Sequence, residues 1–163
     1  MFEHFNTPQE LFGYQLATTM TMENDSLDML KELEGAAQAD EIKKLFAHHQ
    51  DETRQQIANL ERIFELLDIE KNAEPSPTTK GLAKEGSSMI GKTDPKLVDS
   101  VALSAALGTE HYEMSVYESL ITMAEAMGAA EVQELLQENL QQEQHTADEL
   151  NAAAKKCAAK AIV

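Results

Sequence analysis

Four long helical segments of this chain each carry a glutamate near their middle, where the helical repeat calls for an apolar core side chain. The glutamates are Glu23, Glu52, Glu113 and Glu143, with Glu110 one turn before Glu113. A buried carboxylate destabilises a fold unless something neutralises it. Carboxylates on converging helices also repel one another, and a bound cation is the plainest way to neutralise them. The sequence therefore predicts helices that pack around an internal metal site.

Capping signals divide the chain into four long helices and one long connection. The residues Thr7-Pro8-Gln9-Glu10 have the pattern of a capping box, and we expect the helix that they start to stop at Gly35. Other glycines, prolines and capping residues set the remaining boundaries, so the expected helices cover residues 8–34, 40–69, 95–127 and 130–156. Segment 72–95 holds the remaining prolines and predicts a crossover with a short helix at 77–90, which Ser76 would cap.

The lengths of the connections predict the topology. Helices one and two, like helices three and four, are joined by only a few residues, so each pair should form an antiparallel hairpin. The crossover is long enough to run the length of the bundle. The prediction is an all-α fold, a ferritin-like four-helix bundle of two antiparallel hairpins, with residues 1–163 as a single domain.

Charge and cysteine content narrow the range of partners and cellular locations that we expect for the chain. The formal net charge is −16, which disfavours nucleic acid and anionic membrane as partners and suits a protein that attracts cations. The chain lacks an apolar run of membrane-spanning length, and residues 1–12 lack the apolar core of a secretory signal. Cys157 is the only cysteine, which excludes an intrachain disulfide and makes a reducing cytoplasm the expected location.

The histidines differ in their placement on the predicted helices. His49 lies on the core face of its helix, one turn before a midpoint glutamate, and is a good ligand candidate. His48, His111 and His145 lie to the side of their apolar stripes, where we expect them to be solvated.

Tyr117 lies one turn after Glu113, where it would donate a hydrogen bond to a ligand carboxylate or simply pack in the core. A single glutamate beside an apolar stripe usually reaches solvent. The midpoints of antiparallel helices lie in one layer, however, so the repeated coincidence favours one shared internal site.

Several segments together form a pattern: residues 22–27, 49–67, 80–86 and 136–150, and EHYE at 110–113 followed four residues later by Tyr117. The pattern covers nearly the whole chain and resembles the YciE/YciF group of ferritin-like proteins. The resemblance implies a four-helix bundle with a dinuclear iron or manganese centre, often dimeric and linked to stress responses. The ligands that it implies are also those that the periodicity selects: Glu23, His49, Glu52, Glu110, Glu113 and Glu143.

The chain departs from the usual di-iron pattern, which has Glu-x-x-His on two helices. Here Glu52 is followed by Gln55, and Glu143 is followed by Thr146. A site rich in carboxylates and poor in histidine has a harder ligand set. Manganese, magnesium or calcium, weakly held iron, and one ion in place of two are therefore all open alternatives.

Two classes of function follow. In the first, the chain is a redox metalloprotein whose dinuclear centre oxidises iron(II) or consumes peroxide, with oxygen or peroxide as reaction partner. In the second, it is a non-enzymatic, stress-associated bundle whose metal is structural or absent, and it acts through dimer or partner contacts. The incomplete Glu-x-x-His motifs favour the second class. The resemblance and the large apolar helix surface predict a homodimer in both.

Overall fold

A computed structural model describes residues 4–161 of the chain. Five α-helices and one 3₁₀ turn make up its regular structure, and this part of the chain contains no strand, which confirms the all-helical prediction. The helices are α1 (Pro8–Ala36), α2 (Asp40–Leu66), α3 (Pro77–Ile90), α4 (Val98–Ala126) and α5 (Ala130–Ala161), with the 3₁₀ helix η1 (Pro95–Leu97) directly before α4. None of these helices is long and apolar enough to cross a membrane.

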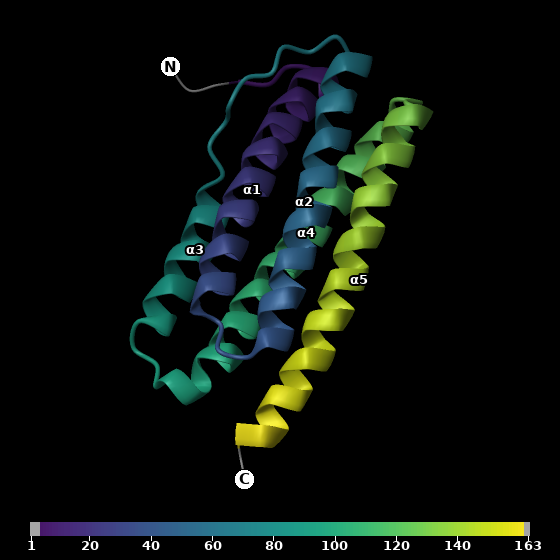
Figure 1. Ribbon diagram of the computed structural model, residues 1–163. Helices are drawn as coiled ribbons and strands as arrows, with labels where there is room; N and C mark the ends of the chain where they lie inside the picture. Colours follow the sequence, from purple (N-terminus) through teal and green to yellow (C-terminus); the bar gives the residue numbers. More distant parts are fainter. Residues whose placement is uncertain (1–3, 162–163) are drawn as a thin grey trace.

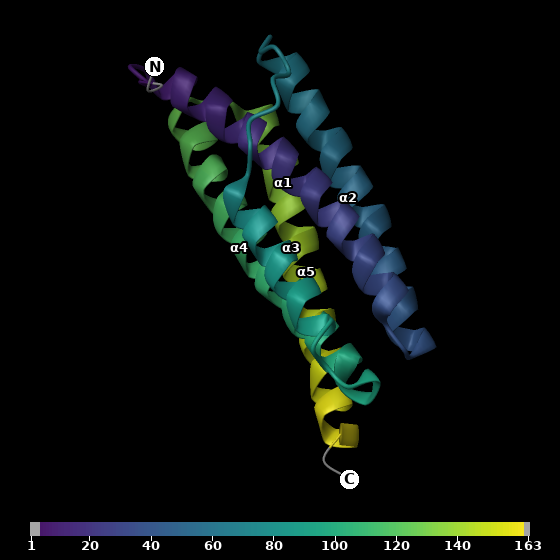
Figure 2. The ribbon, with the colours of Figure 1, turned by 90° about the vertical axis from the view of Figure 1, so that its left-hand side faces the viewer.

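The four long helices lie side by side, and the short α3 lies outside them (Figure 1). Helix α1 packs on α2 and α4, and α5 packs closely on α4 and more loosely on α2. The connection after α2 runs back along the molecule, and α3 within it packs on α1 and α4 (Figure 2). The consecutive pairs α1–α2 and α4–α5 are therefore the two closest helix pairs.

The first helix starts as predicted and ends later than predicted. The Thr7 hydroxyl accepts the Glu10 amide at 3.1 Å, and the Glu10 carboxylate accepts the Thr7 amide at 3.3 Å, so the capping box forms. The prediction that the helix stops at Gly35 is wrong, because α1 continues through this residue to Ala36. The turn is set instead by Asp99 of α4, whose carboxylate accepts the two amides that follow Ala37, at 2.6 and 3.1 Å.

Three other boundaries differ from the expected ones by three residues or more. Helix α2 ends at Leu66, just before Asp68, which has a left-handed φ of 51°. Asp94 accepts the Lys96 amide and so caps the 3₁₀ turn, which delays the start of α4 by three residues. Helix α5 continues to Ala161. Ser76 precedes α3 as predicted, but its side chain makes no capping bond.

Two apolar clusters form the core, one toward each end of the helices. The upper cluster in Figure 1 contains the start of α1 and the end of α2, with Leu16, Phe64, Leu120 and Leu136 among its buried members. The lower cluster contains the opposite ends, with Leu30, Leu33, Phe46, Leu103 and Leu150. Burial of each such side chain stabilises the fold by about 1.5–3 kcal/mol. The midpoint glutamates lie between the two clusters along each helix.

Candidate metal centre

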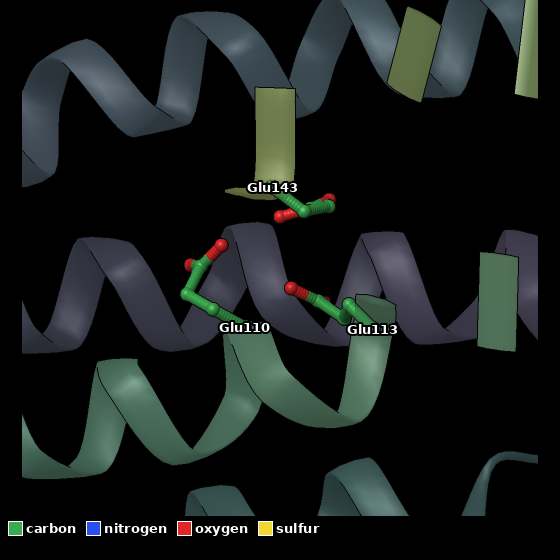
Figure 3. A group of neighbouring side chains, drawn as sticks. All are labelled: Glu110, Glu113 and Glu143. Carbon is green, nitrogen blue, oxygen red and sulfur yellow. The ribbon is translucent and has the colours of Figure 1, made fainter. Parts of the chain in front are cut away.

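Three glutamates from two helices meet in the middle layer. Glu110 and Glu113 lie one turn apart on α4, and Glu143 faces them from α5 (Figure 3). Each offers one carboxylate oxygen, and the three oxygens lie within 4.8 Å of one another. The side chains are buried, at 3%, 1% and 3% exposure. These three residues are called the carboxylate cluster below.

The carboxylate cluster resists ionisation. Burial raises the pKa of Glu110, Glu113 and Glu143 well above the usual value of a glutamate, because water no longer solvates the charged form. The negative charges of neighbouring carboxylates raise each pKa further. The Glu110 carboxyl group beside it raises the pKa of Glu143 further, because a proton on Glu143 can bridge the two groups. Without a cation, the cluster therefore holds protons that water would remove from exposed carboxyl groups.

Glu23 of α1 extends the carboxylate cluster from a third helix. It is fully buried, and its charge contributes to the raised pKa of Glu110 and Glu113. Burial raises its own pKa to about 7, although a hydrogen bond from Tyr117 opposes the shift. The Tyr117 hydroxyl donates to Oε1 of Glu23, so the predicted carboxylate partner of this tyrosine is Glu23. Oε2 of Glu23 has no partner within residues 4–161.

A ladder of polar side chains, buried except for Gln55 at its outer end, holds Tyr117 in place. Asn139 of α5 donates from Nδ2 to the Tyr117 hydroxyl at 3.0 Å, which leaves the phenol proton free to point at Glu23. Asn59 of α2 donates to Oδ1 of Asn139 at 2.8 Å, and Gln55 donates to Asn59 at 3.2 Å. One ladder therefore joins α2, α5, α4 and α1, and it fixes which oxygen of Glu23 stays free.

Glu52 and His49 lie at the edge of the middle layer, on the side where α2 meets α5. The Glu52 side chain is 17% exposed, and its Oε2 accepts a hydrogen bond from the Thr146 hydroxyl at 3.1 Å. His49 is buried, and its Nε2 lies 3.3 Å from Oε2 of Glu149. Burial lowers the pKa of His49, while the nearby carboxylates Glu149 and Glu52 oppose that shift. The charge of Glu52 acts on Glu110 and Glu143, whereas His49 is paired with Glu149, and neither residue belongs to the tight group of three.

The residues present fit a hard divalent cation. Four carboxylate oxygens lack a hydrogen-bond partner in the described part of the chain, one each from Glu23, Glu110, Glu113 and Glu143. Buried polar atoms in proteins are nearly always bonded, so four orphaned acceptors in one layer point to a ligand. Carboxylate oxygens are the donors that manganese, magnesium and calcium prefer, and they also bind iron.

Sequence reasoning missed several residues around the site. Where α2 meets α5, Glu149 contacts His49 and Thr146 contacts Glu52. Asn59 holds Asn139, which in turn bonds Tyr117. Ser26 is buried on α1 and lowers the pKa of Glu113 through a side-chain hydrogen bond. The sequence could have indicated Thr146 and Asn139, because both are polar and lie at helical spacing from Glu143. It could not have indicated Glu149, because the partner of this residue depends on how α2 is aligned against α5.

The fold and the sequence both define the class of the protein. The family model described as "Domain of unknown function (DUF892)" matches residues 7–162, and the chain belongs to that family. It is 30% identical to protein YciF of Escherichia coli strain K12 over 148 residues, which are 88% of this chain and 87% of YciF. The resemblance to YciF that the sequence suggested is thereby confirmed.

Solved structures agree with this assignment. The crystal structure of the E. coli stress protein YciF matches with a TM-score of 0.91 at 26% identity, covering 96% of this chain and 99% of YciF. YcfI from Rhodopseudomonas palustris matches with a TM-score of 0.88 at 26% identity, covering 93% and 98%. A protein from Xanthomonas campestris shares the fold, with a TM-score of 0.78 at 23% identity, covering 94% and 95%.

Proposed function

We propose that the chain is a ferritin-like four-helix bundle whose carboxylate cluster, together with Glu23, holds a dinuclear iron or manganese centre. Glu52 and His49 would complete the ligand set from α2. Glu52 would give up its hydrogen bond from Thr146 to bind an ion, and His49 has a buried Nδ1 without a partner in residues 4–161.

One observation carries the proposal: four buried carboxylate oxygens in one layer have no donor to satisfy them. Removing several like charges from water destabilises a fold by several kcal/mol per ion unless an opposite charge compensates. The ladder beyond Glu23 uses hydroxyl and amide groups, and no lysine or arginine takes part in it. A divalent cation held by Glu110, Glu113 and Glu143, with Glu23 beside them, would supply the missing positive charge.

The activity that this centre supports best is iron(II) oxidation or peroxide consumption. Bound iron or manganese would supply the redox chemistry, and the protein would supply carboxylates that can change their mode of binding. The two apolar clusters would keep bulk water from the centre. YciF of E. coli is described as a stress protein, and we extend a stress-response role, in the cytoplasm, to this chain.

A specific observation favours a second candidate, in which the metal is structural. Gln55 and Thr146 stand where the di-iron pattern has histidine. The Thr146 hydroxyl bonds Glu52, and the Gln55 amide bonds Asn59, so both residues stabilise the protein by themselves. In this alternative the centre holds a hard cation, such as magnesium or calcium, that stabilises the bundle without redox chemistry.

Metal binding is tested first on protein stripped with chelator. We expect the signal of free Mn²⁺ in electron paramagnetic resonance to fall as protein is added, with up to two ions bound per chain. Glu113→Gln should weaken this binding, whereas Glu118→Gln, which changes an exposed glutamate of the same helix, should leave it unchanged. Equal binding by Glu113→Gln and the unchanged protein would exclude the carboxylate cluster as the site.

Aerobic iron(II) then separates the two candidates. The redox function predicts oxidation faster than a buffer blank, and Glu113→Gln should lose the excess rate. Binding of manganese or magnesium without faster iron oxidation would favour the structural role.

We also propose a homodimer for either role. Leu97 and Met89 are exposed at 45% and 48% although they are large and apolar, and a second copy would cover such surface. Light scattering that gives the mass of one chain at micromolar concentration would exclude it.

A further inference from the structure

Helix α3 lies across α1 and α4 on the outside of the bundle (Figure 2). Of its 14 residues only Thr79 and Gly86 are buried, so no large apolar side chain anchors it in the core. A pocket of about 180 Å³ remains between α3 and α1, lined by residues of both helices, among them Met29 and Ile90. The helix therefore covers part of the bundle without filling the surface beneath it.

Two small contacts hold α3 in place. Oγ1 of Thr79 lies 3.0 Å from Oδ2 of Asp25 on α1 and also 3.0 Å from the backbone oxygen of Ser76, so one hydroxyl proton serves two acceptors. Within residues 4–161 this is the only side-chain hydrogen bond from α3 to another helix. At Gly86 the backbone of α3 approaches α4 so closely that an added Cβ would lie 3.1 Å from Cβ of Ala105. Neither contact buries enough apolar surface to hold the helix firmly.

The chain on both sides of α3 is irregular. Residues 69–76 have no regular secondary structure, and residues 91–94 also lie outside helices. A helix as short as α3 is marginal by itself in water. Segments with few buried apolar contacts and an exposed backbone open at the lowest free-energy cost. These are the features of a segment that leaves its neighbours as a unit while the four long helices stay packed.

The surface under α3 is connected to the carboxylate cluster. Met29 borders the pocket beneath α3, and its sulfur lies 3.6 Å from the hydroxyl of Thr109 on α4. Thr109 directly precedes Glu110. Ser26, one turn before Met29 on α1, is buried and lowers the pKa of Glu113 through a side-chain hydrogen bond. The residues that contact α3 therefore lie next to residues that contact the carboxylate cluster.

We propose that α3 is a lid, and that its release from α1 and α4 opens the route by which divalent cations reach the carboxylate cluster. The inference rests on the proposed metal-binding function of the cluster, because a buried metal site needs an entry path. Ser26 and Thr109 would offer hydroxyl oxygens along this route, and such oxygens suit hard cations. The closed lid would keep bulk water from the centre, as closing segments do at other buried sites.

A reversible disulfide tests the lid on the whole chain. The Cβ separation at positions 86 and 105 is 3.1 Å, against about 3.5 Å at the short end of disulfides, so Gly86→Cys/Ala105→Cys in a Cys157→Ser background should form the bond. Oxidised protein should take up Mn²⁺ at least about tenfold more slowly than the same sample after reduction, with the same amount bound at equilibrium. Cys157→Ser alone, oxidised and reduced in the same way, is the control. Equal uptake rates in the two states, with the disulfide verified by mass spectrometry, would overturn the lid.

Loosening the lid should have the opposite effect. Thr79→Val removes the hydroxyl that bonds Asp25 and keeps the size of the side chain. Uptake of Mn²⁺ should become faster by roughly two- to tenfold, the factor expected for the loss of one hydrogen bond. Thr78→Val, at the exposed neighbouring position, is the matched control. Uptake by Thr79→Val that is no faster than uptake by Thr78→Val would contradict the lid.

Hydrogen exchange separates failure of the lid from failure of the centre, because it needs no metal. In metal-free protein the backbone amides of α3 should exchange faster than those of α1 and α4, and the disulfide should slow them. Protection of α3 equal to that of α1 and α4 would overturn the lid even where the cluster binds Mn²⁺. Protein that opens α3 but binds no Mn²⁺ at equilibrium would contradict the proposed centre, and the entry route with it.

Discussion

The middle layer and the apolar clusters on either side of it are built from the same four helices by the same helical repeat, yet only the clusters are complete by themselves. In the lower cluster, Leu30, Phe46 and Leu103 fill the interior and leave no polar atom to satisfy. In the middle layer, Glu23, Glu110 and Glu113 occupy equivalent core positions and leave oxygens without donors. The clusters stabilise the fold under any condition, whereas the middle layer is stable only with protons or cations.

The apolar clusters and the middle layer therefore contribute to the protein in different ways. The clusters fix the distance between helices, and so they hold the carboxylates together against their mutual repulsion. The middle layer adds little to stability when it is charged, and in the proposed function it supplies the metal ligands. Perturbations of the two regions should therefore respond differently to metal and to pH.

The largest effect is expected from truncating a cluster residue. Phe46→Ala should destabilise the fold by about 3–5 kcal/mol, because it removes a fully buried ring and leaves a cavity. Urea unfolding with chelator and with saturating Mn²⁺ should give the same loss. A loss that changes with metal would show that the lower cluster and the middle layer are not separate.

A rise in pH should destabilise the metal-free protein through the buried carboxyl groups of the middle layer. The folded pKa of Glu23 is raised from 4.5 to about 7, and those of the carboxylate cluster are raised well above the usual value. A raised folded pKa stabilises the fold below the unfolded pKa, and this contribution is lost as pH rises through the folded value. Glu23 alone contributes roughly 3 kcal/mol that disappears between about pH 4.5 and pH 8.

Chemical unfolding at pH 5 and pH 8 in chelator measures this loss. Glu23→Gln should flatten the pH dependence, whereas Asp28→Asn, which removes one exposed charge from the same helix, should not. Saturating metal should remove most of the dependence, because the cation replaces the protons. Equal slopes for Glu23→Gln and Asp28→Asn would mean that overall charge repulsion causes the loss.

Metal should stabilise the folded protein through the carboxylate cluster. Free Mn²⁺ at a hundred times its Kd raises the free energy of unfolding by about 2.7 kcal/mol. Glu113→Gln should lose most of this gain, and at pH 8 in chelator it should match or exceed the stability of the unchanged protein, because one repulsive charge is gone. Glu118→Gln should keep the full gain. Melting curves of the three proteins decide the outcome.

The sequence predicts this contrast better than it predicts the surroundings of the site. Helical periodicity within one helix places Glu23, Glu113 and Glu143 on core faces, and local capping signals place most helix ends. The partners of Glu52 and His49 depend instead on the alignment of α2 against α5, which no local pattern encodes. The late end of α1 has the same origin, because Asp99 holds the turn from another helix.

The smallest expected effect comes from Tyr117→Phe, which removes one hydroxyl at the boundary between the two regions. Tyr117 packs in the upper cluster through its ring and belongs to the middle layer through its hydroxyl. The change should destabilise the metal-free protein by about 1–2 kcal/mol, because Oε1 of Glu23 loses its donor. The hydroxyl also lowers the pKa of Glu23, so its removal should move the pH-dependent loss of stability to higher pH. Tyr112→Phe, on the same helix and outside the ladder, is the control. A pure packing role for Tyr117 predicts a similar small loss at every pH, whereas a shift of the pH profile in Tyr117→Phe alone assigns the hydroxyl to the middle layer.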